Sequence, residues 1–401
     1  MTHFNSLGSN YTVDFVIKAL LTLNRRKYIT ELQELLKKKY QGEVTLLYKG
    51  REALELALRL TDTPKGCKVV INGFTCYAVY KAIENAGYKV VYADVEDDLN
   101  FSPETLEKLL QNNPTVKVVI IQNTLGIPCH IKEIETLCKK NSIILIEDLA
   151  HSAGSTYEDG REAGTVGDFT VLSFSQDKMI DSVSGGALIV RNNKYFNKTI
   201  PQLKNVSYVQ QLKDRLYPLL TLLIRKSYQT GMGKMFHYTL RKFHLLSRPM
   251  AGGKVGELRQ LPGWYCHLAT SQFENLYGNL THRREITLQY SREIEKDILS
   301  IQAIEQMKQG ANVRFFIRVP DRQSLLKYLK PFGVNVADIW YDAPIAPVSY
   351  LSRTTYDHNC PRAEKITETI VNLPTHRGMT ALSVSRIARK VNIWYQSQLK
   401  K

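Results

Sequence analysis

The chain has 401 residues, of which 43% are hydrophobic and 23% are charged, and its formal net charge is +16. This composition excludes an intrinsically disordered chain, and the length favours one large domain with a smaller one. The longest apolar runs cover less than half of the roughly 20 residues that cross a bilayer, which excludes a transmembrane protein.

The start of the chain lacks the continuous apolar core and the small-residue cleavage site of a secretory signal peptide. The six cysteines include no Cys-x-x-Cys pair and show no metal-ligand spacing. Buried free thiols are typical of a reducing compartment, so we expect a cytoplasmic protein without a metal site.

The first 44 residues are expected to form a helical segment, after which the pattern changes. From about residue 68 to residue 190, short β-branched runs alternate with stretches of helical periodicity. Those runs are KVVING (68–73), YKVVYAD (88–94), VKVVIIQ (116–122), SIILIED (142–148), FTVLSFS (169–175) and GALIV (186–190). Apolar strands separated by helices predict an α/β fold with a mostly parallel sheet and helices on both faces. We assign this sheet to a large domain spanning 45–274.

Beyond residue 274 the pattern changes again, to charged amphipathic helices with few strands. The expected elements are a helix at 281–298, a strand at 312–320, a helix at 322–333 and a final helix after residue 376. Together they predict a smaller α+β domain over 275–401.

Most of the positive charge lies in one segment of the large domain. Between Lys198 and Lys254 there are eleven Lys and Arg residues and a single acid, Asp214. Apolar residues follow helical spacing beside these cations, although Pro218 predicts a helix start or a kink near that point. They are Leu212, Leu216, Leu219, Leu220 and Leu223. We interpret 198–255 as a basic amphipathic insert.

Three explanations of this insert stay open. It suits contact with the inner surface of an anionic membrane, it could pack on its own domain with the charges outward, or it could attract an acidic substrate such as a nucleotide diphosphate. The chain contains no recognised nucleic-acid-binding module, so nucleic acid is not an expected partner.

Four short motifs contain the residues suited to chemistry: YKGREAL (48–54), NGFTCYA (72–78), IEDLAHSAG (146–154) and SFSQDK (173–178). A lysine walled by strand ends near a cation has a lowered pKa, and its neutral amine can condense with an aldehyde, which makes Lys178 a candidate nucleophile. Backbone N–H groups at the helix start near Gly50 favour a phosphate group. Strand alternation turns Glu147 away from the side of Asp148, so Asp148 is the better candidate acid.

In this order and spacing the motifs resemble the DegT/DnrJ/StrS family of sugar aminotransferases, and SQFENLYGNLTHRREITLQY (271–290) extends the resemblance over nearly the whole chain. The resemblance implies the fold-type-I aminotransferase scaffold and pyridoxal 5'-phosphate as the cofactor. It also implies a homodimer with its sites at the subunit interface.

The resemblance also implies a role for each matched residue. Lys178 is the catalytic lysine that binds the aldehyde of the cofactor and then moves protons. Asp148 pairs with the pyridinium nitrogen, His151 lies beside the phenolic oxygen of the ring, and Ser173 donates a hydrogen bond to the phosphate. Gly50 begins the helix whose backbone holds the phosphate.

The chain departs from the family pattern at several positions. Arg51 stands where the family has Thr or Ser, and Cys76 stands where the family usually stacks an aromatic ring on the cofactor. The family's GEGG motif becomes VSGG (183–186), its HxYG turn becomes NTLG (123–126), and its asparagine that reaches the partner subunit is not found. These changes concern substrate and dimer contacts and put the sugar specificity in doubt.

We therefore expect transfer of an amino group from an amino acid, with glutamate as the expected donor, to a nucleotide-linked keto-sugar or a related activated sugar. A sugar dehydratase on the same fold is opposed by Lys178, because that type has a histidine there. The alternative from another class is a catalytically degenerate relative that acts as a membrane-docked binding or regulatory protein. The altered VSGG motif favours it, whereas Lys178, Asp148 and Ser173 oppose it.

Overall fold

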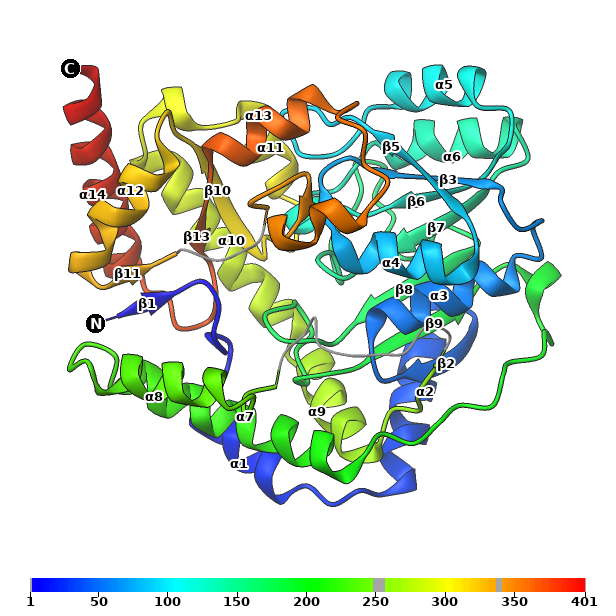
Figure 1. The fold of residues 1–401 in the computed structure, drawn as a ribbon, viewed down its shortest axis with the longest axis horizontal. Helices are drawn as coiled ribbons and strands as arrows, with labels where there is room; N and C mark the ends of the chain where they lie inside the picture. The colour runs from blue at the N-terminus through cyan, green and yellow to red at the C-terminus, as the bar shows by residue number, and fades with distance from the viewer. Residues whose placement is uncertain (1, 248–256, 337–340, 401) are drawn as a thin grey trace.

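The computed structural model describes residues 2–247, 257–336 and 341–400, and its centre is a seven-stranded sheet (Figure 1). The strand order is β2-β9-β8-β7-β6-β3-β5. Strand β9 pairs antiparallel with both neighbours, and the other pairs are parallel. The strands are β2 (Glu43–Leu47), β3 (Lys68–Asn72), β5 (Lys89–Ala93), β6 (Val116–Ile121), β7 (Ile144–Asp148), β8 (Phe169–Ser173) and β9 (Gly186–Val190). The mostly parallel sheet is confirmed, and β2 is an addition that the sequence analysis did not predict.

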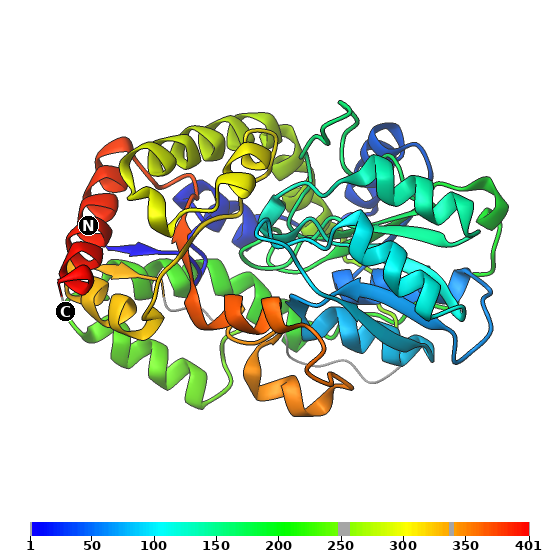
Figure 2. The ribbon, with the colours of Figure 1, turned by 90° about the horizontal axis from the view of Figure 1, so that it is seen from above.

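Helices cover both faces of this sheet, as predicted (Figure 2). Within β6, Val118 and Ile120 belong to one core cluster, while Val119 and Ile121 belong to another, because successive side chains of a strand point to opposite faces. The first cluster includes α3 (Gly50–Leu60) and α4 (Tyr77–Ala86). The second includes α1 (Val13–Leu21), α2 (Arg26–Tyr40), α5 (Pro103–Asn112), α6 (Ile131–Lys140) and α9 (Gly263–Glu274).

A second group of elements lies beside the sheet, at the left of Figure 1. Strand β10 (Arg314–Arg318) pairs antiparallel with β13 (Ile370–Pro374). The helices of this group are α10 (Leu276–Glu293), α11 (Ile301–Met307), α12 (Arg322–Leu329), α13 (Pro361–Thr369) and α14 (Ala381–Leu399). Each predicted element beyond residue 274 has a counterpart here, and the domain boundaries themselves stay a prediction.

Two short parallel pairings tie distant parts of the chain together. Strand β1 (His3–Phe4) pairs with β11 (Val334–Asn335), which brings the N-terminal segment against the C-terminal elements. Strand β12 (Ile345–Ala346) pairs with β4 (Thr75–Cys76), directly beside the predicted site residue Cys76. The C-terminal part of the chain therefore forms a wall next to the carboxyl edge of the large sheet.

The basic insert contains two helices, α7 (Tyr208–Lys226) and α8 (Met232–Lys242), that lie near α1 along the lower edge of Figure 1. Of the helix start or kink predicted near Pro218, the start is wrong: the helix begins at Tyr208, where the Ser207 hydroxyl accepts a hydrogen bond from the Gln210 N–H. Pro218 sits inside α7 on its buried face, where packing offsets the single backbone hydrogen bond that proline removes. None of the described helices is both long enough and apolar enough to span a bilayer.

Part of the insert packs firmly on the rest of the chain through Asp214. Its buried carboxylate accepts hydrogen bonds from the hydroxyls of Tyr48 at 2.6 Å and Tyr265 at 2.7 Å, and from the Gln210 amide at 2.8 Å. The acid that the sequence shows alone among many cations is therefore an internal anchor, and its charge does not reach the surface.

We expect Asp214→Ala to lower the free energy of unfolding by about 3 kcal/mol, because it leaves the buried hydroxyls of Tyr48 and Tyr265 without their acceptor. Urea denaturation of the cofactor-free protein measures this change. Asp297→Ala, at an exposed carboxylate, serves as the control and should leave the midpoint unchanged. Equal midpoints for the two variants would contradict the anchoring role.

Candidate active site

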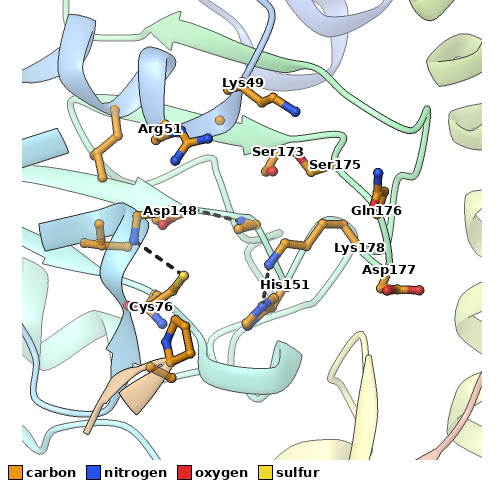
Figure 3. Close-up of a pocket in the computed structure, with 18 of the residues that line it drawn as sticks. Lys49, Arg51, Cys76, Asp148, His151, Ser173, Ser175, Gln176, Asp177 and Lys178 are labelled. Atoms are coloured by element: carbon orange, nitrogen blue, oxygen red, sulfur yellow. Dashed lines mark hydrogen bonds between the residues drawn. The ribbon is translucent and has the colours of Figure 1, made fainter. Parts of the chain in front are cut away.

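The site residues predicted from the sequence all line one pocket at the carboxyl ends of β7 and β8 (Figure 3). They are Gly50, Arg51, Cys76, Asp148, His151, Ser173 and Lys178. Parallel strands end at one edge of a sheet, and loops that leave that edge bring distant motifs together. The geometry therefore unites all four motifs.

A lysine–histidine contact lies at the centre of this pocket. The Nζ atom of Lys178 is 2.8 Å from Nε2 of His151 (Figure 3). The backbone N–H of Leu125 donates to the other ring nitrogen, Nδ1, at 3.3 Å. A neutral imidazole that accepts at Nδ1 carries its proton on Nε2, so Nε2–H donates to the lysine nitrogen. That arrangement requires an amine with a lone pair, which is a neutral Lys178.

The electrostatic surroundings favour the same protonation states. Burial lowers the pKa of Lys178, and the nearby Arg314 guanidinium lowers it further, against opposing contributions from Cys76 and Asp148. Burial also lowers the pKa of His151 well below its usual range, with Lys178 and Arg314 acting in the same direction. Taking a charge out of water disfavours the charged form of both groups. Burial therefore favours the neutral forms of both groups relative to the same groups in water.

Asp148 is the buried acid of the pocket, at the last position of β7. Burial raises its pKa to about 6, although a 2.9 Å hydrogen bond from the Ala150 N–H and the charge of Lys178 oppose that rise. Glu147 points away, as predicted, and accepts hydrogen bonds from the Tyr157 hydroxyl at 2.8 Å and the Gly164 N–H at 2.7 Å. A cation at the pocket side of Asp148 would favour the ionised form of this carboxylate.

The N-terminus of α3 closes the pocket on the opposite side. A Cβ atom on Gly50 would lie 2.6 Å from the Cβ of Ser173, so only glycine lets the helix start approach the end of β8 so closely. Arg51 follows it and is largely buried. Lys49 lines the same pocket, donates to the Ser184 hydroxyl at 2.8 Å, and has a pKa that burial lowers to about 8. Lys49, Arg51 and the N-terminus of α3 together form a cradle that suits an anion.

The sequence left open whether Cys76 itself or a neighbouring aromatic residue packs on the cofactor ring, and Cys76 lines the pocket. Cys76 is the N-cap residue of α4, and its Sγ accepts from the Ala78 N–H at 3.5 Å. The neighbouring Tyr77 stacks on Tyr350 with ring centroids 4.8 Å apart, and it is not among the residues that line the pocket. An aromatic ring does line the pocket at Tyr341, which stacks on Phe74.

Several pocket residues were not predicted from the sequence. They are Lys49, Gln122, Ser175, Gln176, Asp177, Tyr341, Ala346 and Pro347, together with four apolar or small residues of α3, α4 and the β7–β8 side. Lys49, Ser175 and Gln176 belong to the four sequence motifs, and Gln122 ends a predicted strand. Their positions in the sequence therefore pointed to the site. No sequence pattern pointed to Tyr341, because only tertiary packing brings this residue to His151. The Tyr341 hydroxyl lies 3.4 Å from Nδ1 of His151.

Comparison with known proteins agrees with this geometry. The model of the DegT/DnrJ/EryC1/StrS aminotransferase family matches residues 23–392. The chain is 26% identical to the UDP-4-amino-4,6-dideoxy-N-acetyl-beta-L-altrosamine transaminase of Campylobacter jejuni strain 81-176, over 80% of this chain and 78% of that protein. It is 23% identical to the dTDP-3-amino-3,6-dideoxy-alpha-D-galactopyranose transaminase of Aneurinibacillus thermoaerophilus, over 86% of this chain and 83% of that protein.

Among solved structures, the Helicobacter pylori aminotransferase PseC superposes with a TM-score of 0.71 at 20% identity, covering 96% of each chain. The expected fold is thereby confirmed, and so are the expected enzyme class, an aminotransferase, and its cofactor, pyridoxal phosphate. With 23–392 matched by the family model, the chain belongs to the DegT/DnrJ/EryC1/StrS aminotransferase family.

Proposed function

We propose that this chain transfers the amino group of an amino acid, with glutamate as the donor, to the keto group of a nucleotide-linked sugar or a related activated sugar. The observation that carries the proposal is the buried contact of Lys178 with His151, beside Asp148 and opposite a cationic cradle. The Campylobacter and Aneurinibacillus relatives, which are transaminases of UDP- and dTDP-linked sugars, support the acceptor class.

The residues of the pocket fit pyridoxal phosphate in their chemistry. The amine of Lys178 would bind the aldehyde, and the protonated ring nitrogen would place a cation beside the buried carboxylate of Asp148. The cradle of Gly50, Arg51 and Ser173 would hold the phosphate. When bound, the cofactor supplies an electron sink for the negative charge that develops at the reacting carbon.

The chain's own side chains then handle protons and water. With the cofactor bound, the Nζ atom of Lys178 would take the proton from the α carbon of the donor and would pass it to the cofactor, which receives the amino group in the same half-reaction. His151 orients that amine by donating a hydrogen bond from its Nε2–H. Because the His151 side chain is buried, it does this without a solvent contact of its own. The active unit in this proposal is a homodimer, which the family resemblance supports. Sedimentation equilibrium of the purified protein would test this oligomeric state.

The half-reaction with glutamate is the direct test of the proposed function. Added to the cofactor-loaded protein, L-glutamate should remove the near-visible absorption band and yield about one equivalent of 2-oxoglutarate per site, since one amino group is transferred per cofactor. UDP-, dTDP- or GDP-linked keto-sugars should then restore the band and appear as amino-sugars in the mass spectrum. D-Glutamate is the control. A band that no amino acid removes would overturn the proposal.

Nothing in the described part of the chain supports the alternative of a degenerate relative that has lost catalysis. The catalytic lysine expected from the resemblance lines the pocket, and the candidate acid lies beside it. The altered VSGG motif ends at the start of β9, where Gly186 allows the backbone of Gly50 to approach. That close approach of Gly50 and Gly186 helps to form the anion-binding cradle at the start of α3.

A further inference from the structure

The helical hairpin of α7 and α8, residues 208–245, is apolar on two opposite faces of its first helix. One face is buried against α1 and the core through Tyr217, Thr221 and Ile224. On the opposite side, leucines recur at helical spacing and stay partly or largely exposed. They are Leu212, Leu216, Leu219 and Leu223, of which Leu212 is 57% exposed. A surface helix needs one apolar face to fold, so this second face calls for a partner.

The second helix also exposes large apolar side chains. Exposed large apolar side chains of the described chain concentrate in this hairpin, and in α8 they alternate with cations. Met232, Met235, Tyr238, Phe243 and Leu245 are all exposed, Met235 by 68%. Long flexible and amphipathic aromatic side chains of this kind insert readily at a lipid–water boundary.

The exposed charges of the hairpin have one sign. The exposed cations are Lys226, Lys234, Arg241 and Lys242. Asp214 is the only acid between 208 and 245, and it is buried beneath Tyr48 and Tyr265. Arg215 and Arg225 turn inward to backbone carbonyls of α1 and its flank, at Ala19 and Tyr11. The outer face therefore presents apolar groups and positive charge with no acid among them.

The positive charges on the outer face of the hairpin indicate which partner can cover it, a second copy of the chain or a membrane. In a two-fold contact centred on this patch, the patch of a second copy would bring cations against cations, which is unfavourable. A bilayer rich in anionic phospholipid offers apolar chains beneath a layer of negative phosphates, which matches both features. In Figure 1 the two helices and α1 lie along one edge of the molecule, so they can approach a flat surface together.

We propose that the α7–α8 hairpin docks this enzyme on the surface of a membrane that contains anionic phospholipids. The exposed side of α1, with Val13, Ile17 and Leu21, adjoins the hairpin and extends the apolar surface. This inference is independent of the proposed sugar and donor, because none of the hairpin residues 208–245 lines the pocket of Lys178.

The test is co-sedimentation of the full-length, cofactor-loaded protein with vesicles. Phosphatidylcholine vesicles containing about one third phosphatidylglycerol should bind it, and pure phosphatidylcholine vesicles should bind it far less, since each basic residue attracts an anionic surface. Binding should weaken at about 0.5 M NaCl, where screening shortens the range of these charges to roughly 4 Å. Equal binding to both vesicle types would overturn the proposal.

Two double variants separate the contributions of charge and apolar contact. Lys234→Glu with Lys242→Glu should reduce the partition coefficient at least about tenfold, and Met235→Ser with Tyr238→Ser should reduce it as well. The matched control, Lys108→Glu with Lys140→Glu, changes exposed lysines of α5 and α6 and should bind like the wild type. An unchanged near-visible absorption band verifies that each variant is folded.

Sedimentation velocity without vesicles decides whether another copy covers the face instead. We expect the hairpin variants to keep the oligomeric state of the wild type. If the hairpin variants dissociate and the wild type does not bind vesicles, the face is covered by a second copy of the chain and membrane docking is overturned. Hairpin variants that bind anionic vesicles as tightly as the wild type would overturn it too.

Discussion

Lys178→Ala is expected to abolish the near-visible absorption band of the cofactor-loaded protein and to lower turnover by about a thousandfold or more. In the proposed mechanism the band depends on the covalent link to this lysine, and the turnover depends on its amine as the proton carrier, a role worth on the order of 10² to 10⁴ in rate. Burial lowers the pKa of Lys178, which favours the neutral amine that both tasks require. Absorption spectra and initial rates of the two proteins measure the difference.

Lys49 provides a matched control inside the same pocket. Its pKa is also lowered by burial, to about 8, yet its Nζ atom donates to Ser184 beside the anion cradle. Lys49→Ala should therefore keep the absorption band and weaken the affinity for the cofactor. Borohydride reduction followed by peptide mapping should label the peptide that contains Lys178. A label on Lys49 would refute the assignment of Lys178.

Asp148→Asn should lower turnover by roughly a hundredfold to a thousandfold, while making the cofactor-free protein more stable at neutral pH. The first effect follows because a neutral amide no longer holds the proton on the ring nitrogen, which weakens the electron sink. The second follows because burial raises the pKa of Asp148 to about 6. Its ionised form is therefore less favourable in the folded chain than in the unfolded one.

The stability gained by Asp148→Asn should depend on pH in a defined way. Wild-type stability is full below the unfolded pKa near 4 and is lost as pH rises to the folded pKa of about 6. At pH 7.5 the variant should exceed the wild type by up to about 3 kcal/mol, and at pH 4 the two should coincide. Urea denaturation of the cofactor-free proteins at both values measures this. A variant that is less stable at pH 7.5 and fully active would contradict both parts.

The sequence predicted the large sheet well because its strands are locally encoded. Runs such as VKVVIIQ are β-branched, nearly continuous and bounded by turns, so each is recognisable without its neighbours. Strand β2 was missed because Glu43 to Thr45 are partly exposed at the sheet edge and lack that apolar continuity. The two-residue pairing of β4 with β12 leaves no period that a sequence could reveal.

The site residues were predictable to the extent that their motifs lie at strand ends. Lys178 and Asp148 follow recognisable strands, and the order of the motifs carried the resemblance to the family. Lys49 was overlooked because a single lysine is usually solvated, and only the packing of α3 against β9 shows that this one is buried. Tyr341 reaches His151 through tertiary packing alone.

The pairing of β4 with β12 also sets a limit on when the pocket can exist. Thr75 and Ile345 lie opposite each other in this pairing and are 270 positions apart in the chain. A ribosome adding about 5 to 20 residues per second needs roughly 15 to 50 seconds to bridge that interval. From the addition of Lys178 until the end of that time, the nascent protein holds its lysine and its acid beside an open wall, where Ala346 and Pro347 are still missing. Stable capture of the cofactor consequently has to wait until residues 345–347 have left the ribosome.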